Sequence, residues 1–264
     1  MRTTKLRDEC GAAEVHHRIV SAHLNNERSV WIREPLDKAK PSNLIVFLDA
    51  ELYRDKVGAH TILHDLQAKG EVADSLSVFL SYGSLEARAL ECPCHPPFAA
   101  FVAEELLPWI WSRFPAAKDA STRILTGLSY TGLAASYVAS LHPGAFTKII
   151  SQSGSYWSNH CWLVDQVGRM NGWIPPAFYL DVGLRETDAP VRHNPDLVQE
   201  VSQIDGVRAF RDALTAKGAQ VMYVEFDGTH DFEAWKKTLP DALKWALPRA
   251  SARPTEGVRP PSPT

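Results

Sequence analysis

The residues best suited to chemistry lie in the stretch RILTGLSYTGLAASYVASLHP, where Ser129 follows Gly127 by two positions. A serine hydroxyl becomes an effective nucleophile only when a base removes its proton, a third group orients that base, and N–H donors hold the oxyanion. The G-x-S-x-G turn exposes such a serine between a strand and a helix. Here Thr131 stands in place of the second glycine, and Gly132 follows directly. The motif favours Ser129 as a nucleophile, with an ordinary helix N-cap as the alternative.

The base and the acid are expected downstream, because enzymes built on this strand–turn–helix motif order them as Ser, acid, His. His230 lies in EFDGTHDFEAW, a turn between a predicted strand and a predicted helix, and is the expected base. Glu186 is the first choice for the acid and Asp188 the alternative, since both follow the strand-like run AFYLDVG. Asp181 lies inside that run and is assigned a structural role. A solvated Glu186 and a Ser–His pair without an acid stay open.

Backbone N–H groups are expected to form the oxyanion hole. Tyr130 follows the nucleophile directly, and Glu51 follows the strand-like run IVFLDA. Because these are main-chain roles, the side chains at the two positions are free to vary.

The elements that position these residues are read from hydrophobic patterning. Two strand-like segments flank the turn-prone Asn25-Asn26-Glu27 and predict an antiparallel N-terminal hairpin. Short apolar runs, typical of strands buried on both faces of a sheet, cover residues 43–50, 76–83, 122–127, 147–154, 177–183 and 221–228. Amphipathic helical patterns lie between them, and this alternation predicts a mostly parallel sheet. We therefore predict an α/β-hydrolase fold, with a central sheet covered by helices on both faces.

The same patterning sets the boundaries. One domain is expected over residues 1–248, and the Pro-rich segment 249–264 is expected to be a disordered tail. Pro108 is expected to kink a helix or to begin one, and Pro240 is expected to break the last helix.

Composition excludes several partners. The formal net charge is -3, which argues against nucleic acid. No apolar run approaches the roughly 20 residues of a membrane span, and the first residues lack the apolar core of a signal peptide, so a cytoplasmic location is expected. Cys92-Pro93-Cys94-His95 has C-x-C-H spacing rather than the paired C-x2-C of a zinc site. No metal or other cofactor is expected, and the sequence does not indicate the oligomeric state.

Several motifs together resemble those of the enterochelin esterase and esterase D group of α/β hydrolases, over residues 15–247. They are IVFLDAELYRD, SLEARALECPCHPPFAAFVAEELLPWI, LTGLSYTGLAASYVASLHPGAF, SQSGSYW, VGLRET and FDGTHDFEAWKKTLPDAL. The chain departs from the family pattern at Ala50, Thr131 and Thr229, each of which replaces a glycine common in the family.

The resemblance implies Ser129 as nucleophile, His230 as base and Glu186 as acid. It also implies that four further residues line or brace the substrate cleft: Arg88, Tyr156, Trp157 and Trp235. Aromatic walls would suit a catecholate or another aromatic acyl group, although plain core packing is an equal alternative for the tryptophans.

The predicted function is that of a serine carboxylic ester hydrolase working through an acyl-enzyme. Its expected partner is a small-molecule ester of siderophore type or with an aromatic acyl group, and its activity is expected to fall at acid pH as His230 takes up a proton. Two alternatives stay open: an acyltransferase of the same fold, and a catalytically silent α/β hydrolase that only binds a ligand.

Overall fold

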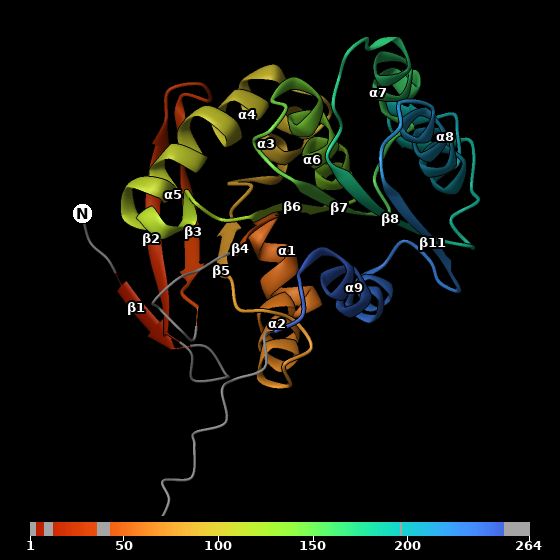
Figure 1. The fold of residues 1–264 in the computed structure, drawn as a ribbon. Coiled ribbons are helices and arrows are strands. Elements are labelled where there is room, and N and C mark those ends of the chain that lie inside the picture. The colour runs from red at the N-terminus through yellow and green to blue at the C-terminus, as the bar shows by residue number, and fades with distance from the viewer. Residues whose placement is uncertain (1–3, 8–12, 36–42, 196, 251–264) are drawn as a thin grey trace, which may run out of the picture.

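The computed structural model describes residues 4–7, 13–35, 43–195 and 197–250, and its centre is a nine-stranded sheet. The strand order is β1-β2-β3-β5-β4-β6-β7-β8-β11 (Figure 1). The strands are β1 Thr4–Arg7, β2 Ala13–Ser21, β3 Asn26–Arg33, β4 Asn43–Leu48, β5 Leu76–Leu80, β6 Thr122–Leu128, β7 Lys148–Gln152, β8 Ala177–Gly183 and β11 Val221–Phe226.

The sheet is antiparallel at its N-terminal edge and parallel beyond it. β1, β2, β3 and β5 pair antiparallel, whereas β5, β4, β6, β7, β8 and β11 run parallel. All residues of β4 and β5 are buried, as expected of strands covered on both faces. The carboxyl ends of the parallel strands therefore meet at one edge of the sheet, where α/β proteins place their ligands.

Helices cover both faces of the sheet (Figure 1). Their buried apolar side chains form one hydrophobic cluster on each face. One face carries α1 Ala50–Leu52, α2 Ala59–Ala68 and α9 Phe232–Ala246. The other carries α3 Leu85–Glu91, α4 Pro96–Ala100, α5 Leu107–Arg113, α6 Tyr130–Leu141, α7 Ser158–Arg169 and α8 Gln203–Ala216. Two π-helical segments, Tyr53–Val57 and Phe101–Leu106, and a 3-10 turn, Pro115–Ala117, complete the helical elements.

The strand predictions are confirmed for the front hairpin, which is β2–β3, and for all six apolar runs. Pro108 lies in the first turn of α5, directly after a π-helical segment, which agrees with the helix start and not the kink among the two predicted outcomes. The predicted break at Pro240 is wrong, because α9 runs through it. Leu239, Ala242 and Leu243 are buried against the sheet, and this packing holds the helix despite the missing backbone donor.

Two features were not predicted. β1 adds a ninth strand at the edge, and β9 Val191–Asn194 pairs antiparallel with β10 Leu197–Gln199 in a separate small sheet. The predicted tail falls almost entirely on residues 251–264, which lie outside the described residues. Within the described part of the chain, no helix has both the length and the apolar character of a membrane span.

Candidate active site

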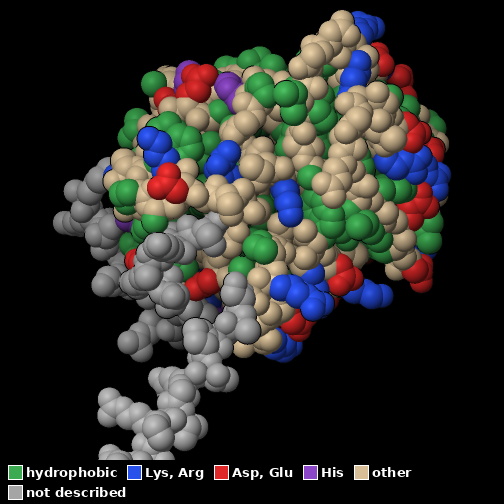
Figure 2. Space-filling view, viewed as in Figure 1, with side chains coloured by type: hydrophobic (Ala, Val, Ile, Leu, Met, Phe, Trp, Pro, Cys, Tyr) green, Lys and Arg blue, Asp and Glu red, His purple; other side chains and the backbone are tan. Residues whose placement is uncertain are grey.

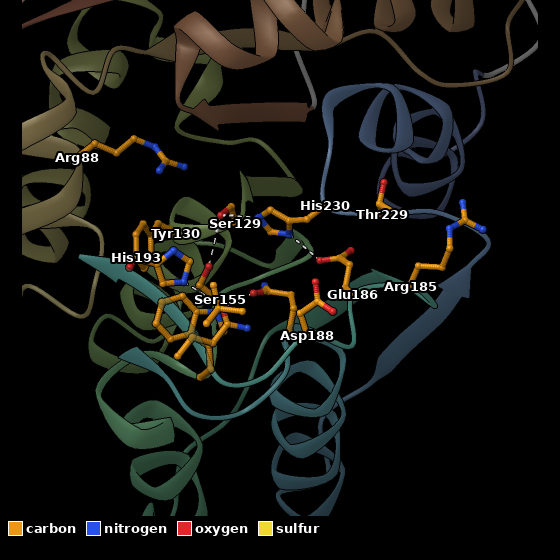
Figure 3. A pocket seen from close by; sticks show the side chains of 14 residues that line it. Arg88, Ser129, Tyr130, Ser155, Arg185, Glu186, Asp188, His193, Thr229 and His230 are labelled. Atoms are coloured by element: carbon orange, nitrogen blue, oxygen red, sulfur yellow. Dashed lines mark hydrogen bonds and ion pairs between the residues drawn. The ribbon is translucent and has the colours of Figure 1, made fainter. Parts of the chain in front are cut away.

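Ser129 lies where β6 ends and α6 begins, with φ 53° and ψ −124°. A non-glycine residue at positive φ is strained, at a cost on the order of 1–3 kcal/mol, and such strain concentrates at functional sites. The tight turn also explains Gly127, because a Cβ there would lie only 2.1 Å from the carbonyl oxygen of Thr131. The turn directs the Ser129 hydroxyl away from the sheet and into a cavity (Figure 3).

His230 and Glu186 complete a hydrogen-bonded chain with this serine. His230 Nε2 lies 3.0 Å from Ser129 Oγ, and His230 Nδ1 lies 2.6 Å from Glu186 Oε2 (Figure 3). The histidine comes from the turn between β11 and α9, and the next residue, Asp231, caps α9 by accepting from the Ala234 N–H. The His230 side chain is 38% exposed and the Glu186 side chain only 1%. The Glu186 carboxyl group is therefore enclosed by the protein, whereas the His230 imidazole faces the cavity.

Glu186 is held by neutral donors rather than by solvent. Its Oε1 accepts from Ser153 Oγ at 2.7 Å and from the Gly183 N–H at 2.7 Å. Trp235 donates from Nε1 to the same Ser153 hydroxyl at 3.0 Å, and its ring meets the His230 ring edge-on at 4.8 Å. These donors fix the position of the carboxyl group whose other oxygen bonds His230. The alternative acid, Asp188, lines the cavity but is exposed on its loop and makes no described bond to His230.

Thr131 joins the serine turn to the loop after β4. Its hydroxyl accepts from the Leu128 N–H at 3.0 Å and lies 2.9 Å from both the Leu128 carbonyl and Asp49 Oδ2, either of which can take its single proton. Asp49 is buried and left-handed, with φ 62°, and begins α1. Burial raises the pKa of the Asp49 carboxyl, while Arg88, which donates to it at 2.7 to 2.9 Å, acts in the opposite direction.

The contact between Thr131 and Asp49 brings the N-termini of α6 and α1 together. Tyr130 is the first residue of α6 and Glu51 the second of α1, so neither backbone N–H has a partner within its own helix. The Glu51 carboxylate turns away and accepts from the Ser81 hydroxyl and the Tyr82 N–H. Both N–H groups therefore lie at helix N-termini without a helix partner, and that of Tyr130 directly follows Ser129, as an oxyanion donor would.

A cavity of about 410 Å³ opens over the three residues. Arg88, Tyr130 and Trp157 form part of its wall, whereas Tyr156 and Trp235 do not reach it. Tyr156 is buried instead, with its hydroxyl 2.7 Å from Ser136 Oγ and 2.8 Å from Ser151 Oγ. It braces α6 against β7 rather than lining the cleft, as Trp235 braces His230.

The family of the chain follows from its similarity to known sequences. A family model described as "Putative esterase" matches residues 21–246. The chain belongs to this esterase family. This membership and the relatives below confirm the predicted resemblance to enterochelin esterases.

Two relatives of the chain are named as iron(III) enterobactin esterases. The one from Dickeya dadantii is 27% identical over 88% of this chain and 55% of its own length, and the one from Escherichia coli O6:H1 is 33% identical over 84% and 54%. The solved enterochelin esterase of Shigella flexneri superposes with a TM-score of 0.74 at 26% identity, over 88% of this chain and 57% of that one. The predicted α/β-hydrolase fold is thereby confirmed. The chain spans about half the length of these curated relatives.

Three polar residues of this site were not predicted from the sequence. Ser153 links Glu186 to Trp235, Ser155 Oγ lies 3.4 Å from Ser129 Oγ, and His193 stacks on Trp157 with ring centroids 5.1 Å apart. The two serines lie in SQSGSYW, whose strand-end position and serine content were the available signal. His193 belongs to the unpredicted β9–β10 hairpin, so no sequence signal placed it here.

Cys92 and Cys94 do not line this site. Burial raises the pKa of the Cys94 thiol to about 12 and also raises that of the Cys92 thiol well above its usual value, so neither is a ready thiolate. Among the residues that the structure describes, no three His, Cys, Asp or Glu side chains converge as a metal site would require.

Proposed function

We propose that the protein is a serine carboxylic ester hydrolase in which Ser129, His230 and Glu186 form a catalytic triad. The observation that carries the proposal is the continuous chain of hydrogen bonds, 3.0 Å from Ser129 Oγ to His230 Nε2 and 2.6 Å from His230 Nδ1 to Glu186 Oε2. These distances fall within the reach that a nucleophile, a base and an orienting acid require. Membership in the esterase family supports the reaction class.

The reaction follows from this arrangement. His230 Nε2 takes the proton of the Ser129 hydroxyl while Oγ attacks the ester carbonyl carbon, and the N–H groups of Tyr130 and Glu51 hold the resulting oxyanion. Collapse of the tetrahedral intermediate breaks the ester C–O bond, and the imidazolium of His230 gives its proton to the departing alkoxide. His230 then deprotonates water, which attacks the acyl-enzyme; as the acyl–Oγ bond breaks and the acid leaves, the imidazolium returns that proton to Ser129 Oγ. Glu186 stabilises the imidazolium throughout.

The substrate class is proposed from the cavity and from the relatives. Two aromatic rings, Tyr130 and Trp157, form part of the cavity wall with their centroids 5.7 Å apart, and flat aromatic acyl groups pack well on such surfaces. The curated relatives are named as esterases of iron(III) enterobactin. We therefore place siderophore-type and aromatic acyl esters first. On the face drawn in Figure 2, basic and acidic side chains are interspersed, as suits a small-molecule substrate better than nucleic acid.

Turnover of p-nitrophenyl butyrate by wild type, Ser129→Ala and His230→Ala tests the reaction. Each variant should lose at least a thousandfold in kcat, because triad members act as a unit. The control is Ser112→Ala, an exposed serine on α5, which should retain wild-type turnover. Full activity in Ser129→Ala would overturn the assignment. Absence of Ser129 labelling by a fluorophosphonate in the folded protein would favour a silent ligand-binding protein, and an ester product with an added alcohol would favour an acyltransferase.

A further inference from the structure

A second cavity of about 500 Å³ adjoins the first and is larger than it. The two cavities share Tyr130 and His193, so they meet at these two side chains. Beyond that boundary, the walls of the second cavity come from α3, the loop after it, the start of α7 and the β9–β10 hairpin. They include Ala89, Leu90, Pro93, Asn159, Asn194 and Leu197. The proposed reaction uses none of these six residues.

Planar side chains lie along the boundary between the two cavities. The His193 ring lies nearly parallel to Trp157, with an interplanar angle of 8°, and the Trp157 ring is 5.7 Å from that of Tyr130. The Arg88 guanidinium lies 5.8 Å from the centre of the Tyr130 ring. A flat group crossing from one cavity to the other would pass over aromatic faces along its route.

The walls of the second cavity are neutral. None of the described residues that line it carries a carboxylate, an ammonium or a guanidinium group, and His193 is its single titratable ring apart from the Tyr130 phenol. The first cavity differs, because Arg88, Arg185, Glu186 and Asp188 lie along it. The second cavity therefore suits an uncharged, apolar group.

The orientation of the triad indicates which half of an ester reaches the second cavity. The alkoxide must leave on the side of His230, because that imidazole supplies its proton. Tyr130 and His193 lie on the other side of Ser129 from His230 (Figure 3). We propose that the second cavity is a binding site for the far end of the acyl group, specific for long, uncharged acyl chains that end in an aromatic ring. The proposal rests on the proposed ester hydrolysis and adds to it the length and character of the acyl group.

A strained turn at the rim of the second cavity supports this proposal. Asn159, His160 and Cys161 follow one another in left-handed conformation, with φ of 52°, 56° and 59°. Three consecutive non-glycine residues of this kind are rare, and such strain persists where the surroundings hold a functional shape. Here the turn places Asn159 in the cavity wall.

Two substitutions fill the second cavity without touching the triad. Ala89→Trp and Leu90→Trp each add bulk from an exposed position of α3, so the fold should tolerate them. The matched control is Leu85→Trp, on the same helix and 68% exposed, which lines neither cavity. The substrates are p-nitrophenyl acetate and p-nitrophenyl 6-phenylhexanoate, which share a leaving group and differ only in the acyl chain.

We expect wild type to prefer the phenylhexanoate in kcat/KM by at least tenfold. Ala89→Trp and Leu90→Trp should lower this preference at least tenfold, chiefly through KM, and Leu85→Trp should keep it. Equal loss on both esters, or an unchanged preference in both filling variants, would overturn the acyl site while leaving the hydrolase intact. Failure of wild type to cleave either ester would instead overturn the proposed function, and the acyl site with it.

Discussion

Ser129 and Glu186 are unlike ordinary residues of their types, and the difference lies in what surrounds them. Ser129 holds a positive φ that a serine rarely adopts, and it is the N-cap residue of α6 without making a side-chain capping bond. Glu186 is nearly fully buried, yet it is bonded by two neutral donors in addition to His230. Both observations argue against the alternatives of a simple cap and a solvated loop charge.

Glu186→Gln tests whether this acid orients the base. The amide keeps the shape and can still accept from Ser153 and Gly183, but it no longer stabilises a protonated His230. We expect kcat for p-nitrophenyl butyrate to fall by roughly 10²–10⁴-fold, as when the acid of a Ser-His-Asp triad is replaced by its amide, with little change in the melting temperature. Asp188→Asn is the comparison, and it should lose less than threefold. A larger loss in Asp188→Asn than in Glu186→Gln would transfer the role to Asp188.

The three triad candidates could be predicted from the sequence because each follows a buried strand, where chain position implies spatial position. Thr131 shows why spacing alone was less informative. The strict motif requires a glycine at position 131. The Thr131 hydroxyl instead bonds the Leu128 backbone and Asp49, and Asp49 is 82 positions away in the sequence. Such a long-range partner leaves no local pattern. The bracing roles of Tyr156 and Trp235 were equally hidden, because an aromatic residue in a core and one in a cleft share the same pattern.

The contact between β6 and α6 is the element on which the nucleophile depends. Gly127 allows the strand and the helix to approach closely, since a Cβ at this position would meet backbone atoms of Thr131 at 2.1 and 2.2 Å. Backbone cannot move aside as the end of a flexible side chain can. The first turn of α6, which carries the Tyr130 N–H, would have to shift instead.

Gly127→Ala should therefore be among the most damaging single-methyl substitutions in the protein. We expect a loss of at least a hundredfold in kcat and a destabilisation of roughly 2–4 kcal/mol, in the range of severe steric changes. Gly168→Ala is the matched control, because a Cβ there meets nothing within 4 Å and the residue lies in helix α7. That control should be neutral or stabilising by up to about 1 kcal/mol. Urea unfolding and initial rates measure both effects, and wild-type behaviour of Gly127→Ala would contradict the contact.

Element prediction succeeded where burial imposes a pattern and failed where it does not. The continuous apolar runs of β4 to β8 could be recognised because both faces of those strands are covered. β9 and β10 are short, and β9 is mostly exposed, so neither apolar runs nor alternation marked them. α9 departs from the rule that a proline breaks a helix, because burial of its apolar face outweighs the loss of the backbone hydrogen bond that Pro240 cannot donate.

Across the whole molecule, parallel topology brings distant residues together. Ser129 and His230 are 101 positions apart, and Glu186 and His230 are 44 apart, yet each pair is hydrogen-bonded because their strands end at one edge of the sheet. The strand β8 that leads to Glu186 also carries Asp181, fully buried beneath the site. Its Oδ1 accepts from the Ser153 N–H at 3.2 Å, so it adjoins the group that bonds Glu186.

Asp181 should make the stability of the whole fold depend on pH. Burial, with the nearby Glu186 charge adding to it, raises the pKa of its carboxyl from 3.8 to about 7. Between these values the unfolded chain has lost the proton and the folded protein keeps it, so the free energy of unfolding falls as pH rises. Each unit of pKa difference corresponds to about 1.4 kcal/mol, which puts the total effect on the order of 4 kcal/mol.

Asp181→Asn removes this titration while keeping a neutral group of the same shape. Its stability relative to wild type should therefore increase from pH 4.5 to pH 7 and then level off, because above pH 7 folded wild type carries the buried charge at full cost. Guanidinium unfolding at pH 4.5, 5.5, 6.5 and 7.5 measures the difference directly. Stability curves that stay parallel across that range would show that Asp181 is ionised in the folded protein throughout, with its charge compensated by the neighbouring donors.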